Sequence, residues 1–294
     1  MDSENSGANA LPLVSSVLHP TDFSTASEEA FAHALAIAQI RQTEFTILHV
    51  GSEVDAETAR KRFPRVRETL VHWGLLKPDS PGSAVLDELN IQVNKITLHG
   101  SDPGLETLRY LADNPVDLIV LATEGRAGLP RWIEPSIAET LARSSRTMSL
   151  FVPHGVKRAP VSLAGGILSV HNILVPVDHH PHPGAALEFA RRAAETIGDG
   201  VVTITLLHVG DAHFPAQRLE NGPNWSWRVK TCAGDSVAQI IKTANEIQAE
   251  LIVMTTTGHN GVLDVLRGST TEQVLRRSPC PLLAVPARFS TQDS

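Results

Sequence analysis

The chain of 294 residues is long enough for about two domains of ordinary size. With 42% hydrophobic and 19% charged residues, its composition excludes an intrinsically disordered chain, a collagen and a coiled-coil rod. The formal net charge of −7 argues against a nucleic-acid-binding surface and against a polybasic membrane-binding surface, since both need clustered positive charge.

The first half of the chain alternates short apolar runs with helical patterns, which is typical of a parallel sheet flanked by helices. A helix is expected after the first strand, where Thr25 and Glu28 have capping-box spacing, and another from Asp102. A further helical-looking stretch runs over 56–76. The apolar runs that we expect to be strands cover residues 14–19, 45–50, 118–121 and 150–152.

The second half repeats this order. A helix with an apolar stripe is expected to end at Gly198, and another to begin near Asp235. The segment 210–227, with Trp225 and Trp227, is expected to be a loop too short for a helix comparable to that of the first half. The apolar runs expected as strands cover residues 173–177, 202–209, 251–254 and 282–285.

The two halves are also related residue by residue. Residues 117–153 align without gaps to 250–286, with 13 identities in 37 positions. Upstream, Asp22 and His49 return as Asp178 and His208 at the ends of matching apolar runs. We therefore predict a duplicated architecture, divided into a tail (1–13), a first domain (14–153), a linker (154–170) and a second domain (171–287).

The second half brings polar groups to the strand ends, where open parallel sheets bind ligands. Asp178 follows the first strand, and Thr255 opens a loop that contains Gly258 and leads to Gly268, Ser269 and Thr270. Glycines let backbone amides approach a phosphate, and hydroxyls at a helix start add donors. A carboxylate after the first strand can accept from a ribose hydroxyl.

This combination resembles the universal stress protein family, here as a tandem member from about Val14 to Ala287. The ATP-binding members of that family carry the pattern G-x2-G-x9-G-[S/T]. Gly258, Gly268 and Ser269 match its second part, whereas Thr255 stands at its first glycine. If that position needs a positive φ, a β-branched residue there would cost about 1–2 kcal/mol.

The resemblance implies two tandem flavodoxin-like (adenine nucleotide alpha hydrolase-like) domains, each a doubly wound parallel sheet. It also implies a stress-response regulator that binds ATP, with or without Mg²⁺, as a conformational ligand in the second domain. The implied nucleotide-binding residues are Val177, Asp178, Val209, Met254, Thr255, Gly258, Gly268, Ser269 and Thr270. The alternatives are a nucleotide-free interaction scaffold and a slow nucleotide hydrolase.

The equivalent positions of the first domain predict a degenerate nucleotide site. They are Asp22, Val50, Gly125 and Ser136, while Ala122 and Pro135 stand where the pattern has glycines. Pro135 cannot donate an amide hydrogen to a phosphate. We therefore expect a structural or regulatory role for this copy.

Several histidines have two interpretations. His179, His180 and His182 form either a metal site or pH-sensitive lid, or an exposed loop, and the second is favoured because no Cys or carboxylate cluster stands nearby. His49 and His208 are expected to be structural. No catalytic residues are predicted, since neither a P-loop nor a magnesium carboxylate pair is visible and phosphoryl transfer needs positioned cations.

Location and partners are expected as follows. No secretory signal and no run long enough to cross a bilayer is visible, so a cytoplasmic protein is predicted. Cys232 and Cys280 are too few for a disulfide framework and lack CxxC spacing, and a single bridge between them has no support in the sequence. The resemblance implies that the two domains pair through their final strands, near 150–152 and 282–285. A homodimer and an unidentified protein partner are further expectations.

Overall fold

The computed structural model describes residues 14–51, 61–123, 147–210, 214–215, 219–256 and 270–287. The described part of the first half contains β1 (Ser16–Pro20), α1 (Thr25–Arg41), β2 (Glu44–Gly51), α3 (Val66–His72), α4 (Ala84–Asp87), β3 (Gln92–His99), α5 (Pro103–Asp113), β4 (Leu118–Thr123) and β5 (Met148–Pro153). The described part of the second half contains β6 (Val170–Pro176), α7 (Gly184–Ile197), β7 (Gly198–Val209), β8 (Trp225–Cys232), α8 (Ser236–Glu246), β9 (Leu251–Thr256), α10 (Thr270–Leu275) and β10 (Leu282–Pro286).

These strands form one sheet in the order β3-β2-β1-β4-β5-β10-β9-β6-β7-β8. Within each half, every neighbouring pair of strands is parallel. The strand order reverses beside the first strand of each half, because β1 lies between β2 and β4, and β6 lies between β7 and β9. The predicted doubly wound α/β fold is confirmed, and each reversal is the point at which such sheets bind ligands.

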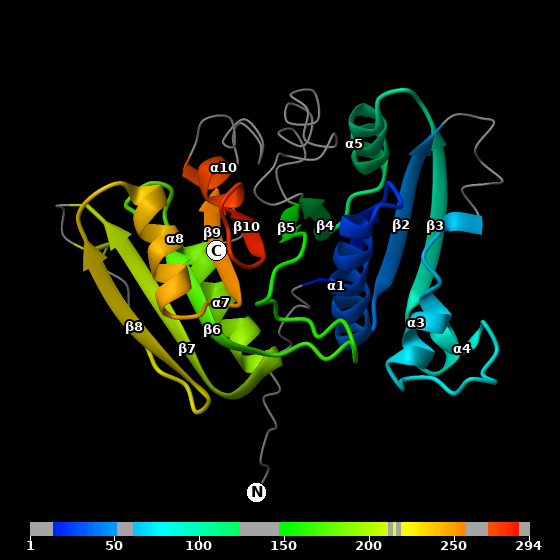
Figure 1. Cartoon of the computed structure of the whole chain (residues 1–294), viewed down its shortest axis with the longest axis horizontal. Helices are drawn as coiled ribbons and strands as arrows, with labels where there is room; N and C mark the ends of the chain where they lie inside the picture. Colours follow the sequence, from blue (N-terminus) through cyan, green and yellow to red (C-terminus); the bar gives the residue numbers. More distant parts are fainter. Residues whose placement is uncertain are drawn as a thin grey trace, which may run out of the picture.

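The two halves meet edge to edge. β5 runs antiparallel to β10, with Leu150 opposite Leu283, so the sheet continues from one half into the other (Figure 1). Both leucines are almost fully buried, as expected for strands covered on both faces. The prediction that the final strands pair is confirmed, and the strand order reads the same outward from this junction in both directions.

Helices cover both faces of the sheet. α1, α7 and the α3–α4 segment pack on one face, around Leu35, Leu70 and Ala190, whereas α5, α8 and α10 pack on the other, around Leu108 and Ile240. A fully buried leucine or isoleucine contributes about 1.5–3 kcal/mol relative to an exposed one. Among the described residues, no helix is both long and apolar enough to span a bilayer.

The start of α1 differs from the prediction. The N-cap is Ser24, whose backbone is extended and whose hydroxyl accepts a hydrogen bond of 3.2 Å from the Ser27 amide. Thr25 is already helical, so the capping box of Thr25 and Glu28 is wrong. The Asp22 carboxylate fixes this register, because it accepts from the Ser24 amide at 2.9 Å.

Neither edge strand of the sheet, β3 or β8, was predicted from the sequence. β3 and β8 are mostly half-exposed, so they lack the continuous apolar runs by which the inner strands were found. Trp225 and Trp227 belong to β8, not to the expected loop. The continuous helix expected over 56–76 is also wrong within the described residues, because α3 begins only after Pro64.

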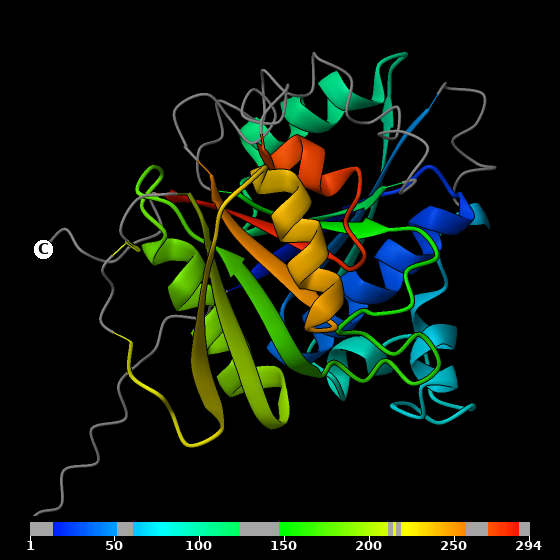
Figure 2. The same ribbon diagram turned by 60° about the vertical axis from the view of Figure 1, so that its left-hand side comes forward.

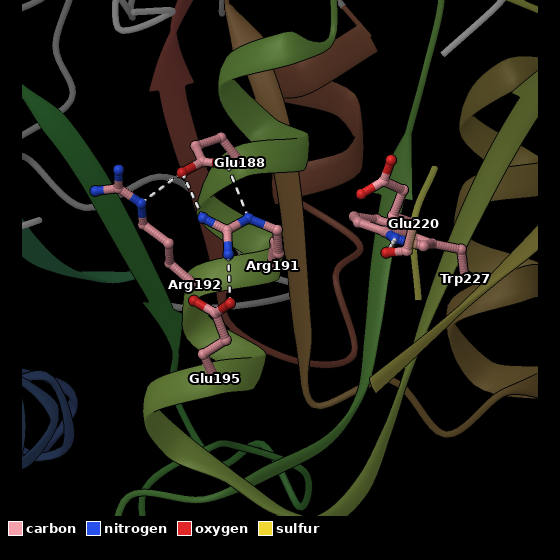
Figure 3. Close-up of polar contacts among 6 residues, drawn as sticks. All are labelled: Glu188, Arg191, Arg192, Glu195, Glu220 and Trp227. Carbon is pink, nitrogen blue, oxygen red and sulfur yellow. Dashed lines mark hydrogen bonds and ion pairs between the residues drawn. The ribbon is translucent and has the colours of Figure 1, made fainter. Parts of the chain in front are cut away.

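A charged network of half-exposed side chains lies along α7 (Figure 3). Glu188 accepts hydrogen bonds from Arg191 at 2.8 and 3.0 Å and from Arg192 at 2.5 Å, and Arg191 also pairs with Glu195. The hydrogen bond from Arg191, aided by Arg192 and opposed by partial burial, lowers the pKa of Glu188. The network is half-exposed, so we expect solvent to screen most of its effect on stability.

Candidate nucleotide-binding site

A cavity of about 220 Å³ lies where the strand order of the second half reverses. Its walls come from the C-terminal ends of β6, β7 and β9, the first turn of α8, the start of α10 and the segment between β6 and α7. It therefore occupies the place that the strand-order rule predicts for a ligand.

The floor of the cavity is apolar. Val177, Leu207, Ile240 and Met254 line it and are each nearly buried. Val209, the last residue of β7, also lines it and stands in register with Cys232 of β8. An apolar floor with few polar groups suits the flat face of an aromatic ring.

Polar groups stand at the rim. The carboxylate of Asp178 lines the cavity, is exposed, and accepts a hydrogen bond of 2.7 Å from the amide of His179. Thr270 and Thr271 contribute hydroxyl-bearing side chains from α10. Ser236 adds another from the start of α8. The rim can thus accept from a sugar hydroxyl on one side and donate to an anion on another.

Thr255 has a role that the sequence did not indicate. It lies in β9, paired in parallel register with Val285, and its backbone is not in the positive-φ region. Its hydroxyl accepts from the amide of Ala186 at 3.3 Å, near the start of α7, where Pro183 provides no side-chain cap. The cost expected from a positive φ at Thr255 therefore does not arise.

Only some of the residues predicted for this site lie in the part of the chain that the structure describes. Val177, Asp178, Val209, Met254, Thr255 and Thr270 come together around the cavity. Gly258, Gly268 and Ser269 lie outside the described residues.

In the first half, the carboxylate equivalent to that of Asp178 belongs to Asp22 and bonds to a backbone amide of its own loop. Asp22 accepts from the Ser24 amide, as described above, and Val50 is buried. Phe23, which follows Asp22, has a φ of 64° and places its ring 4.2 Å from that of His49. Gly125 and Ser136 lie outside the described residues, so the degeneracy of this copy stays a prediction.

His49 and His208 make equivalent hydrogen bonds in the two halves. The Nδ1–H of His49 donates to the Thr21 carbonyl at 2.9 Å, and that of His208 donates to the equivalent Val177 carbonyl at 3.1 Å. Each imidazole thus ties the end of the second strand to the end of the first. These hydrogen bonds support the predicted structural role of both histidines.

The three histidines after Asp178 do not converge on one point. Among the described residues, no three His, Cys, Asp or Glu side chains gather where they could hold one ion. His180 instead lines the cavity, and the ring of His179 lies 5.8 Å from that of His208 in an edge-to-face arrangement.

The first half contains a buried polar network, formed by His19, Ser27 and Thr21, that was not predicted from the sequence. The imidazole of His19 is fully buried; its Nδ1–H donates to the Val120 carbonyl at 3.0 Å, and its Nε2 accepts from the Ser27 hydroxyl at 3.2 Å. Ser27 and Thr21 share a hydrogen bond of 2.8 Å. Burial lowers the pKa of His19 to about 4, although these bonds and Asp22 oppose the shift. The matching residue in the second half is Val175, a contrast that could have marked His19 as unusual.

The fold and cavity define a doubly wound α/β protein with a cavity at its switch point. The model of the Universal stress protein family matches residues 14–153 and 212–286. The chain belongs to this family.

Individual relatives agree with this assignment. A universal stress protein of Methanocaldococcus jannaschii is 36% identical over 63 residues, which are 21% of this chain and 37% of that protein. The chain therefore matches little more than a third of the length of that relative. A solved universal stress protein from Archaeoglobus fulgidus has the same fold (TM-score 0.61, 18% identity, covering 93% of this chain and 99% of that chain).

Two further solved structures are similar. One is a functionally unknown protein from Pseudomonas aeruginosa, with a TM-score of 0.61, 14% identity and coverage of 95% of both chains. The other is a universal stress protein in complex with cAMP, with 20% identity over 48% of this chain and 97% of that chain and a TM-score of 0.29. At these identities the first similarity concerns the fold alone.

Proposed function

We propose that this protein is a stress-response regulator that binds ATP, or a related adenine nucleotide, in its second half. The observation that carries the proposal is the cavity at the β6–β9 switch point, which combines an apolar floor with the carboxylate of Asp178 and the hydroxyls of α10. Membership of the universal stress protein family supports it. A homodimer, a protein partner and a cytoplasmic location stay predictions from the sequence.

In this proposal each wall of the cavity contacts one part of the nucleotide. The adenine ring packs on Val177, Val209 and Met254, and Asp178 accepts from a ribose hydroxyl. Thr270 and the loop that carries Gly258, Gly268 and Ser269 donate to the phosphates, and Mg²⁺ accompanies them in solution. The hydroxyl of Thr255 accepts from the amide of Ala186 in α7 and so helps to fix the wall of the cavity.

The ligand acts mainly through conformation. α10 contributes the rim of the cavity, and the next element along the chain is β10, the strand that joins the two halves. A nucleotide that binds one arrangement of α10 better than another shifts the population toward that arrangement. The conformational change is then transmitted to the first half through the junction between β10 and β5.

Isothermal titration with ATP and Mg²⁺ tests the proposal, using Asp178→Ala and the matched variant Asp22→Ala. Loss of hydrogen bonds to a charged group is worth about 1.5–3 kcal/mol, so Asp178→Ala is expected to weaken binding by about tenfold to a hundredfold. Asp22→Ala is expected to bind as the wild type does. Absence of binding by the folded wild-type protein would instead favour a nucleotide-free scaffold.

A further inference from the structure

A second concave region lies apart from the nucleotide cavity and shares no lining residue with it. This groove, of about 680 Å³, is formed by residues 153–158 after β5, the last turns of α8 and residues 276–279 after α10. Figure 2 shows the green segment after β5 passing the C-terminal end of the orange helix α8. The groove therefore lies where the first half leads into the linker and contacts the second half.

The groove is strongly cationic. Lys157, Arg158, Arg276 and Arg277 line it, together with the exposed His154, and none of the described side chains that line it is an Asp or Glu. This stands out in a chain with 32 acidic and 25 basic side chains and a net charge of −7. Four like charges along one groove create a local positive potential that favours an anionic partner.

Contacts within the protein leave much of this charge uncompensated. Arg158 donates to the neutral amide oxygen of Asn245 at 2.7 Å. No salt bridge joins Lys157 or Arg277 to any carboxylate in the part of the chain that the structure describes. Glu29, at the edge of the groove, already accepts from the Gly155 amide at 2.9 Å and pairs with His154 at 3.1 Å.

Stabilisation of helix ends does not explain the cations of the groove. The C-terminal ends of α8 and α10 each carry the equivalent of about half a negative charge, so together they need about one compensating positive charge. Lys157, Arg158 and Arg277 supply three formal charges, without counting Arg276, which has a partner of its own. An excess of about two positive charges remains available to a ligand.

We propose that this groove binds an acidic peptide segment of a partner protein. The cations are mostly exposed and come from two distant segments of the chain, an arrangement that suits an extended polyanion better than one enclosed phosphate. Val156, Ile241 and Pro279 form apolar walls between them, so apolar side chains of the segment can pack beside its carboxylates. A bound segment would therefore contact residues 153–158, where the first half ends, and the second half at the same time.

The test is fluorescence anisotropy of a fluorescein-labelled Glu-rich peptide with interspersed Val, with its Gln-rich counterpart as a probe control. The variant is Lys157→Glu with Arg277→Glu, and the matched control is Arg65→Glu with Lys77→Glu, exposed cations elsewhere on the surface. We expect the acidic peptide to bind at low salt and to weaken as salt rises. Reversing two contacting charges is expected to weaken binding by about tenfold, and the control pair is expected to bind nearly as the wild type does.

Circular dichroism establishes that both variants fold, and Lys157→Gln, with an expected severalfold weakening, provides the same test if the double variant does not. Three results would overturn the proposal. The first is no binding of the acidic peptide by the wild-type protein, and the second is equal weakening in the control pair. The third is that ATP displaces the bound peptide from the Asp178→Ala variant, whose nucleotide cavity is impaired. ATP would then be binding in the groove itself, which would make the groove a phosphate site.

Discussion

The stability of the first half should depend on pH through His19. Its imidazole is fully buried, and both ring nitrogens are engaged, by the Val120 carbonyl and the Ser27 hydroxyl. Protonation would turn Nε2 into a donor facing a hydroxyl that now donates to it, at a fully buried position. Burial accordingly lowers the pKa of His19 from 6.5 to about 4.

The magnitude follows from this shift. A change from 6.5 to about 4, at 1.36 kcal/mol per pKa unit, corresponds to about 3 kcal/mol. The unfolded chain takes up the proton first as the pH falls, so the contribution is full above pH 6.5 and is lost progressively down to about pH 4. His33, also buried and with a lowered pKa, adds a loss in the same direction.

The variant to compare is His19→Val, because Val175 is the matching residue of the second half. Urea unfolding followed by circular dichroism at pH 7 and at pH 4.5 gives the free energy of unfolding at each pH. The wild type is expected to lose more stability than the variant between these values, by an amount approaching about 3 kcal/mol. An equal loss in both proteins would refute the assignment of this pH dependence to His19.

Three further outcomes follow from local geometry. Burial raises the pKa of Cys280 to about 12, so a disulfide reagent at pH 8 should label this thiol only after unfolding; rapid labelling of the native protein, seen by peptide mapping, would contradict this. Gly166 has a φ of +64° and a Cβ there would lie 2.2 Å from the Trp73 ring, so Gly166→Ala should destabilise by more than about 2 kcal/mol, whereas Gly155→Ala, with φ +69° and open space, should cost only about 1 kcal/mol; equal melting temperatures would argue against the contact. Thr255→Val removes the hydroxyl acceptor at the start of α7 and should lower the stability by about 1 kcal/mol in thermal unfolding, an effect that Thr255→Ser should largely restore.

The inner sheet was predictable because its strands are buried on both faces. β4 and β9 appear in the sequence as apolar runs, and the repeat between the halves shows that they occupy matching positions. β8 alternates instead, with Trp225, Trp227 and Val229 on one face, and this period of two was a signal that could have revealed it. The capping error at Thr25 arose because Ser24 and Thr25 are both favourable N-cap residues, but only Thr25 has a Glu three residues later.

The site was predictable where strand ends determine it. Asp178, Val209 and Met254 lie far apart in the sequence, yet the rule for parallel sheets brings them to one cavity. The role of Thr255 could not be foreseen, because its hydroxyl meets an amide 69 residues away. The cationic groove depends likewise on how the segment after β5 runs past α8, which no local pattern encodes.

The central claim is that one half of a duplicated chain binds an adenine nucleotide. Equilibrium dialysis of the wild-type protein against radiolabelled ATP with Mg²⁺ measures the number of bound nucleotides per chain most directly. The account predicts one ATP per chain, with the affinity weakened by about tenfold to a hundredfold in Asp178→Ala and unchanged in Asp22→Ala. Two ATP per chain, or none bound by a folded protein, would contradict it.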